Sequence, residues 1–145
     1  MAFIVCDTDF LMKVTTEPLP QLAEFLANKG YKLATVSRIK DELNGLVLSR
    51  DGVTARKARA ALRAISENHI ELLAYSNNFS KKIDADAILI DFAANSNQRL
   101  VTATLDRTIL AALEKKGLPY LTLRKNRPFF RDFESATYLF DKRSL

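Results

Sequence analysis

The sequence predicts an α/β protein, a three-layer α/β/α domain with a central, mainly parallel sheet of about five strands. Short apolar runs of strand length alternate with longer stretches whose apolar residues recur at helical spacing, an order typical of a parallel sheet flanked by helices. The first of these runs is apolar throughout, as expected for a strand that is covered on both faces. The expected strands are residues 3–6, 31–36, 70–74, 99–104 and 120–124.

The first half of the chain begins this alternation. Residues 3–6 are followed at once by Asp7, which places a carboxylate at the carboxyl end of the first expected strand. Residues 21–29 have the apolar spacing of a helix, and Gly30 suits its C-terminal cap. After the second strand, Ser37 is the expected N-cap of another amphipathic helix.

The second half continues in the same order. A basic helix is expected over residues 55–67, before the short third strand. The Ser-, Asn- and Lys-rich residues 75–82 are typical of a loop, and residues 84–95 of a helix. The last helix is expected to begin at Asp106 and to end at Gly117.

The length and the composition predict a single domain and exclude several classes of protein. The chain has 145 residues, which suffices to bury one core, and a net charge of +5. Residues 1–124 are the expected domain, with residues 125–145 as a basic and aromatic C-terminal extension packed on it. With one Cys and one His the chain cannot build a Cys/His zinc site, and its four scattered glycines form no phosphate-binding loop. No signal-peptide or membrane-helix pattern is present, so we expect a cytoplasmic protein without membrane association.

Acidic residues lie where the ligands of parallel sheets bind, beyond the carboxyl ends of the strands. Asp7 and Asp9 follow the first expected strand, and Asp106 follows the fourth. Glu42 lies at the flank of an apolar helix stripe, and Asp86 lies at the edge of the buried face of its helix. A single acid near a helix start usually caps that helix, whereas several acids in one cleft repel one another until a cation binds between them. Oxygen-only ligands favour Mg²⁺ or Mn²⁺, which matches metal-assisted hydrolysis of phosphodiesters.

Four motifs in series resemble the PIN-domain ribonucleases. They are residues 4–11, 36–43, 84–89 and 101–106. The resemblance implies a PIN-like fold and a catalytic metal site whose ligands are Asp7, Glu42, Asp86 and Asp106. It also implies that Thr8 and Thr104 orient these carboxylates. Asp9 departs from the Asn or Ser that is common in the family, and would add either a ligand or a helix cap.

Two other functions compete with an RNA-cleaving enzyme. Asp7 and Asp9 also resemble the Asp-x-Asp motif of haloacid-dehalogenase-type phosphatases, in which the first Asp attacks phosphorus and the second is the general acid. That resemblance is partial, since Phe10 is unusual for the motif and Glu42 and Asp86 are left unexplained. The other alternative is a PIN-like module that binds RNA or a ribosomal particle without cutting it.

Two basic segments are candidates for RNA contacts. Arg56, Arg59 and Arg63 recur at helical spacing, and either bind RNA or form an ordinary solvated face. Arg124, Lys125, Arg127 and Arg131 lie around the start of the extension, interleaved with Phe129 and Phe130. This segment either binds RNA or packs on the domain. The function we expect is a metal-dependent endoribonuclease acting on single-stranded RNA, in RNA processing or as a toxin. The expected partners besides RNA are a second copy of the chain, an antitoxin or a ribosomal particle.

Overall fold

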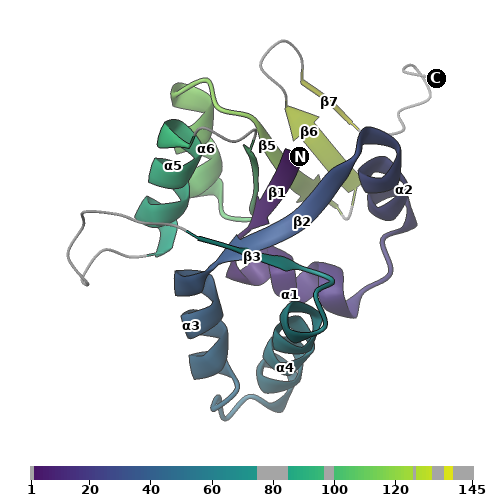
Figure 1. Cartoon of the computed structure of the whole chain (residues 1–145), viewed down its shortest axis with the longest axis vertical. Coiled ribbons are helices and arrows are strands. Elements are labelled where there is room, and N and C mark those ends of the chain that lie inside the picture. The colour runs from purple at the N-terminus through teal and green to yellow at the C-terminus, as the bar shows by residue number, and fades with distance from the viewer. Residues whose placement is uncertain (1, 75–84, 97–99, 126, 132–135, 139–145) are drawn as a thin grey trace.

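The computed structural model contains a seven-stranded sheet in the order β3-β2-β1-β4-β5-β6-β7 (Figure 1). It describes residues 2–74, 85–96, 100–125, 127–131 and 136–138. The strands are β1 (Ala2–Cys6), β2 (Tyr31–Val36), β3 (Glu71–Leu73), β4 (Leu100–Ala103), β5 (Tyr120–Arg124), β6 (Arg127–Arg131) and β7 (Ala136–Tyr138). The helices are α1 (Thr8–Thr16), α2 (Pro20–Lys29), α3 (Ser37–Leu46), α4 (Gly52–Ser66), α5 (Ala85–Asn95) and α6 (Arg107–Lys115).

The predicted fold class is confirmed, because the five expected strands form the parallel part of the sheet. Neighbouring strands from β3 to β5 pair in parallel, and β6 and β7 extend the sheet in antiparallel orientation. The chain moves from β1 outward to β3, and then returns to β4 on the other side of β1. The strand order therefore reverses between β1 and β4, which is where open α/β sheets form a crevice at their carboxyl ends.

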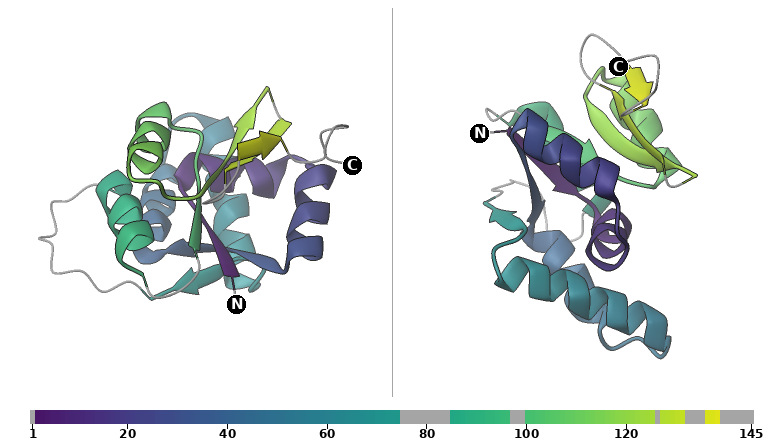
Figure 2. Two further views of the ribbon diagram at one scale, coloured as in Figure 1. Left: turned by 90° about the horizontal axis from the view of Figure 1, so that it is seen from above. Right: turned by 90° about the vertical axis from the view of Figure 1, so that its right-hand side faces the viewer.

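The helices divide into two groups because right-handed crossovers in opposite directions lie on opposite faces of a sheet. Helix α1 contacts α3 and α4, whereas α5 packs on α6 and β4. Figure 1 shows these two groups on separate sides of the strands, and the views in Figure 2 show helices on both sides of the sheet. No helix among the described residues is long and apolar enough to span a membrane.

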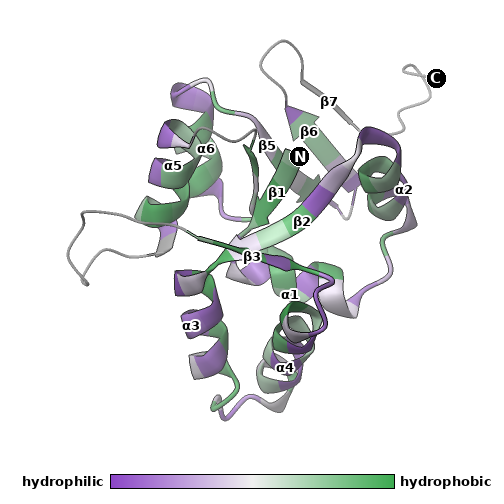
Figure 3. Ribbon diagram, in the orientation of Figure 1, coloured by the Kyte–Doolittle hydropathy of each residue, from purple (hydrophilic) through white to green (hydrophobic). Residues whose placement is uncertain are grey.

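The core follows from the apolar strands. Ile4, Val5 and Cys6 have at most 1% exposure, and the α1 side chains Phe10 and Leu11 are fully buried against them. Figure 3 shows β1 as hydrophobic along its length, whereas α3 and α4 combine hydrophobic and hydrophilic residues. The end of β1 is thereby fixed by packing from both faces.

Several details differ from the sequence expectations or lie beyond their test, and strands β6 and β7 are additional to the five expected strands. Helix α1 was not expected, and it begins directly after Asp7, which serves as its N-cap. Ser37 was expected as an N-cap, but α3 already begins at Ser37 and Val36 occupies the cap position without a side-chain bond. The loop expected over residues 75–82 lies outside the described residues.

Strand β6 packs the beginning of the C-terminal extension on the rest of the fold. The Phe130 ring lies 5.2 Å from that of Phe25 in α2 and 6.1 Å from that of Tyr31 in β2, measured between ring centroids. Phe129 and Phe130 are 9% and 8% exposed. Their rings are therefore part of the core and are not available for stacking on bases.

We predict that Phe130→Ala lowers the free energy of unfolding by about 3–5 kcal/mol, because it removes a buried ring and leaves a cavity. Phe130→Leu should cost less than about 1.5 kcal/mol, since it retains most of the apolar volume. Urea unfolding followed by circular dichroism measures both. As a control, Leu48→Ala should change stability by less than about 0.5 kcal/mol, because Leu48 is 84% exposed. Equal losses for Phe130→Ala and Leu48→Ala would contradict the packing role of β6.

Candidate functional site

The carboxyl ends of β1 and β4 lie side by side at the point where the strand order reverses. Cys6 of β1 is paired with Ala103 of β4, and the Asp7 N–H donates to the Ala103 carbonyl oxygen at 3.0 Å. Asp7 is the first residue after β1, and Asp106 follows β4 after two intervening residues. The sheet itself therefore brings the chain segments of Asp7 and Asp106 together.

The Asp7 carboxylate is held by a backbone N–H of α1 and by the side chain of Thr104, the residue that follows β4. One carboxylate oxygen accepts a hydrogen bond from the Phe10 N–H at 2.9 Å, which caps α1. The other accepts from the Thr104 hydroxyl. Asp7 is 7% exposed and Thr104 is fully buried. The position of this carboxylate is thus fixed on both oxygens.

Burial and neighbouring acids disfavour the ionised form of Asp7. Burial is the main cause that raises the pKa of Asp7 to about 6, while the hydrogen bonds from Thr104 and Phe10 oppose the increase. The negative charges of Asp9 and Asp86 raise this pKa further. Asp86, in the first turn of α5, therefore lies within electrostatic reach of Asp7 although the two are distant in sequence. The carboxylates of Asp7, Asp9 and Asp86 therefore lie in one region of negative charge.

Thr104 connects Asp7 to Asp106. Its side-chain oxygen donates to Asp7 and accepts a hydrogen bond from the Asp106 N–H at 3.1 Å. Asp106 is exposed and caps α6, with its Oδ1 accepting from the N–H groups of Thr108 at 2.7 Å and Ile109 at 3.4 Å. Its other oxygen, Oδ2, remains available for a further ligand.

A second threonine connects α1 to α3 in a similar way. The Thr8 hydroxyl donates to Oε2 of Glu42. The sequence places Glu42 at the flank of the apolar stripe of its helix, but its side chain is exposed in the structure. The β2 strand that precedes α3 is tied to β1 by the buried Thr35 hydroxyl, which donates to the Cys6 carbonyl at 2.9 Å. Glu42 is therefore placed relative to β1 by its strand and by Thr8.

The structure thus gathers the acids without closing them into a cage. Asp9 is exposed in the first turn of α1, and Asp86 is exposed in the first turn of α5. Among the described residues, no three His, Cys, Asp or Glu side chains stand close enough to hold a metal ion by themselves. Mg²⁺ rarely uses such a cage, since it usually binds one or two carboxylates together with waters and substrate phosphates. The chemistry of the donors, all carboxylate oxygens, fits such an ion.

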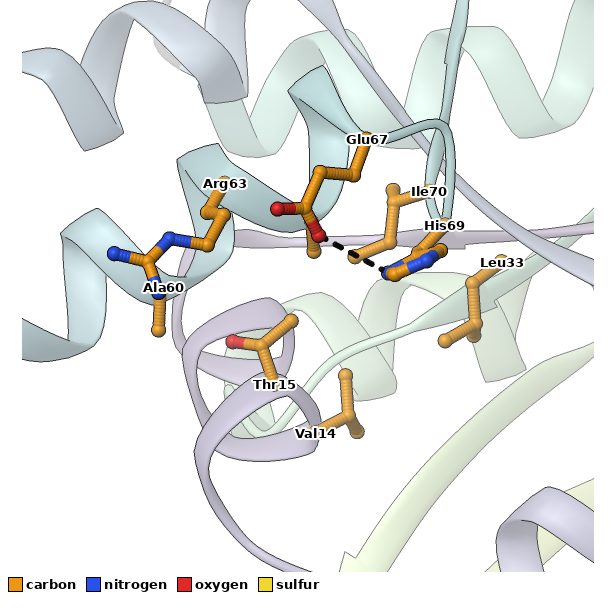
Figure 4. A pocket seen from close by; sticks show the side chains of 9 residues that line it. Val14, Thr15, Leu33, Ala60, Arg63, Glu67, His69 and Ile70 are labelled. Carbon is orange, nitrogen blue, oxygen red and sulfur yellow. Dashed lines mark ion pairs between the residues drawn. The ribbon is translucent and has the colours of Figure 1, made fainter.

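The two basic segments have different positions relative to these acids. Arg56 and Arg59 are exposed on α4, and Arg63 lines a pocket with Val14 and Thr15 from the end of α1. Figure 4 shows this pocket, with an ion pair of 3.8 Å between His69 and Glu67 at its side. Asp7 lies at the opposite end of α1, about 12 Å away along the helix axis. Arg63 is therefore distant from Asp7.

The basic residues of the extension lie closer to the site. Arg124 ends β5, and Lys125 and Arg127 belong to the turn and the strand that follow. Because β5 is parallel to β4, its carboxyl end lies at the same edge of the sheet as Asp106. All three residues are exposed.

The acids lie where the order of the β3-β2-β1-β4-β5 parallel sheet reverses, an arrangement that fits the PIN-like α/β fold expected from the sequence. Comparison with known proteins agrees. Over 128 residues the chain is 27% identical to ribonuclease VapC4 of Methanocaldococcus jannaschii, covering 87% of this chain and 93% of that protein. The structure of the PIN domain endonuclease Utp24 matches with a TM-score of 0.67 and 17% identity, over 89% of this chain and 90% of the other. No family model matches the chain. The predicted resemblance to the PIN-domain ribonucleases is confirmed, and the chain has a PIN-like fold.

We predict that Asp7→Asn stabilises the metal-free protein at neutral pH. The folded-state pKa of about 6 lies above the ordinary value of 3.8, so the folded protein binds the proton more tightly and loses stability as the pH rises through 6. In EDTA at pH 7.5 the variant should be more stable by about 2–3 kcal/mol, and at pH 4 the two proteins should be nearly equal. Urea unfolding at both pH values measures the difference. A variant less stable than the parent at pH 7.5 would contradict the buried charge.

Proposed function

We propose that this chain is a metal-dependent endoribonuclease that hydrolyses phosphodiester bonds of single-stranded RNA. The observation that carries the proposal is the connection of Asp7 to Asp106 through Thr104, with Asp86 within electrostatic reach. A purely structural junction gains nothing from a buried carboxylate beside two further acids, because each charge disfavours the others. The similarity to two proteins named as a ribonuclease and an endonuclease supports the same chemistry.

The residues that would hold the metal are Asp7, Glu42, Asp86 and Asp106, and the ion would be Mg²⁺ or Mn²⁺. Such an ion would acidify the attacking water and neutralise charge on the phosphodiester. The carboxylates orient water at the reacting phosphorus, and Thr104 and Thr8 hold Asp7 and Glu42 in place. The bond from the water oxygen to phosphorus forms and the bond to the 3′ oxygen breaks, which leaves a 5′-phosphate and a 3′-hydroxyl.

The biological setting that we propose is the cytoplasm, in RNA processing or as the toxin of a toxin–antitoxin pair. The expected partners are accordingly RNA, a second copy, and an antitoxin or a ribosomal particle. A neighbouring gene for a small DNA-binding protein would favour the toxin role. Its absence would favour processing.

The phosphatase alternative fits the geometry less well. It uses only Asp7 and Asp9, so the connection of Asp7 to Asp106 through Thr104 has no function in it. That mechanism also gives no role to Glu42, which Thr8 holds at the same crevice. The non-catalytic RNA-binding module is distinguished from the enzyme by the cleavage experiment.

We predict that Asp7→Asn and Glu42→Gln each reduce cleavage of a labelled single-stranded RNA in Mn²⁺ at least a hundredfold. Each removes one charge of the ligand set while it retains the shape of the side chain. Asp41→Asn is the matched control, because Asp41 precedes Glu42 on the same helix and is also exposed. Its activity should stay within twofold of the parent. Gel analysis of the products measures all three.

The same assay separates the alternatives. Equal cleavage by the parent and Asp7→Asn would contradict the assigned site. Binding of RNA by the parent without cleavage of any RNA would favour the non-catalytic module. Hydrolysis of small phosphomonoesters with a covalent phosphoaspartate would favour the phosphatase.

We predict that Thr104 acts as a positioning residue. Thr104→Val removes the hydrogen bonds to Asp7 and from the Asp106 N–H while it preserves the volume, so kcat should fall about 10- to 100-fold. Thr104→Ser should recover most of the activity. Loss of the hydrogen bond should also move the acidic limb of the pH–rate profile to higher pH, because that bond lowers the pKa of Asp7. A merely structural role would leave the limb unchanged and would not distinguish Val from Ser.

A further inference from the structure

A cavity of about 580 Å³ lies between α6 and β5, directly beside Asp106. Leu105 and Arg107, the two chain neighbours of Asp106, both line it. The lining continues along α6 and along β5 as far as Arg124 and Lys125. Its volume lies in the range of sites that bind small organic molecules.

The sheet register places this cavity at the same edge as the acids. Ala103 of β4 is paired with Leu121 of β5, and the two strands are parallel. Thr104, the first residue after β4, still donates its N–H to the Leu121 carbonyl at 3.1 Å, and Arg124 ends β5 three residues further along. Because the two strands are parallel, the end of the cavity that Leu105 and Arg107 line lies at the same edge of the sheet as Asp106.

The charge of the cavity favours an anion. Arg107, Arg124 and Lys125 are exposed cations of the lining. Within the part of the chain that the structure describes, the acid of the lining is Glu114, and its carboxylate forms an ion pair with Arg131 of β6. The negative charge that would oppose an anion is thereby compensated.

The cavity also has an apolar wall and one fixed cation. Leu110 of α6 and Leu123 of β5 are partly buried in the lining. The Arg124 guanidinium lies 4.0 Å from the centre of the buried Phe129 ring, which restricts its motion. Cations beside an apolar wall suit a nucleotide, whose phosphate binds the charges while its base covers the apolar surface.

We propose that the α6–β5 cavity binds a nucleotide of single-stranded RNA adjacent to the bond that is cut. The inference rests on the proposed endoribonuclease function and adds a substrate-binding subsite to it. The cations of α6 and β5 hold the flanking phosphate, and the leucines contact the base. Binding in this subsite would fix which phosphodiester bond of the RNA lies at the acids.

The test measures affinity for a fluorescent 12-nucleotide single-stranded RNA by anisotropy in EDTA, which prevents metal-dependent cutting. The double variant Arg107→Gln/Arg124→Gln should bind about tenfold more weakly at 0.15 M salt. The slope of log affinity against log salt should decrease in magnitude by about 0.7, since one phosphate contact on a single strand contributes about that much. Ala111→Trp, which fills the cavity from an exposed position on α6, should weaken binding several-fold and leave this slope unchanged.

Lys115→Gln is the control, because Lys115 is an exposed cation of α6 outside the cavity lining. It should bind RNA within twofold of the parent. Melting temperatures in EDTA verify that the variants are folded, and the rise in melting temperature with Mn²⁺ verifies that the acids are intact. In cleavage assays the cavity variants should raise KM and change kcat little.

The outcomes separate this proposal from the proposed function. Cleavage by the parent together with parent-like affinity and KM in all cavity variants would overturn the subsite and leave the endoribonuclease intact. If the parent cuts no RNA but the cavity variants bind RNA more weakly than the parent, the subsite is supported and the endoribonuclease function is overturned. An equal loss of affinity in Lys115→Gln would show non-specific charge attraction and would also overturn the subsite.

Discussion

The buried hydrogen bond from Thr104 to Asp7 is the interaction on which the site depends. It joins the ends of β1 and β4, and the same threonine oxygen accepts from the Asp106 N–H. Asp7 also caps α1. One carboxylate therefore fixes where α1 begins and holds the segment after β1 against the segment after β4. Without a hydroxyl at position 104, the Asp7 charge would be buried with one oxygen unsatisfied, which is the costly arrangement for a polar group in a protein interior.

The conflict between stability and chemistry is concentrated at Asp7. Burial disfavours its ionised form, and the charges of Asp9 and Asp86 disfavour it further. In contrast, Asp51 caps α4 at the surface, where hydrogen bonds from Thr54 and Val53 lower its pKa. Both residues cap helices, so capping alone does not require burial beside other acids. The burial of Asp7 beside other acids, which Asp51 does not share, supports a role for Asp7 that requires several negative charges close together. Cation binding is such a role.

The parallel core was predictable because its strands are apolar and its helices are amphipathic, whereas α1 and β6 were not. Helix α1 is short, follows Asp7 without a break, and ends in two β-branched threonines, so its helical pattern is weak. Strand β6 contains Pro128, which usually indicates the absence of a strand. Among the described residues, β7 pairs with Phe129, Phe130 and Arg131 of β6, and none of these pairs uses Pro128, which has no N–H to donate. Both elements depend on tertiary packing that no local pattern encodes.

The acids of the site were predictable by type, and Arg124 and Lys125 were predictable as candidate cations, but the connections among the acids were not. Strand ends identify Asp7 and Asp106 locally, whereas the bond from Thr8 to Glu42 exists only after β1 and β2 are paired. The regular arginine spacing on α4 gave the clearer sequence pattern, yet Arg63 lies at the far end of α1 from Asp7. Arg124 has no periodic pattern, but the parallel pairing of β4 and β5 places it at the edge of the sheet where Asp106 also lies. A polyanion bound across this edge would place one phosphate among cations and its neighbour near the acids. The acids repel a phosphate unless a metal cation compensates their charge. The cations near the end of β5 would then supply affinity for RNA, and the acids near the ends of β1 and β4 would supply the metal-dependent cutting.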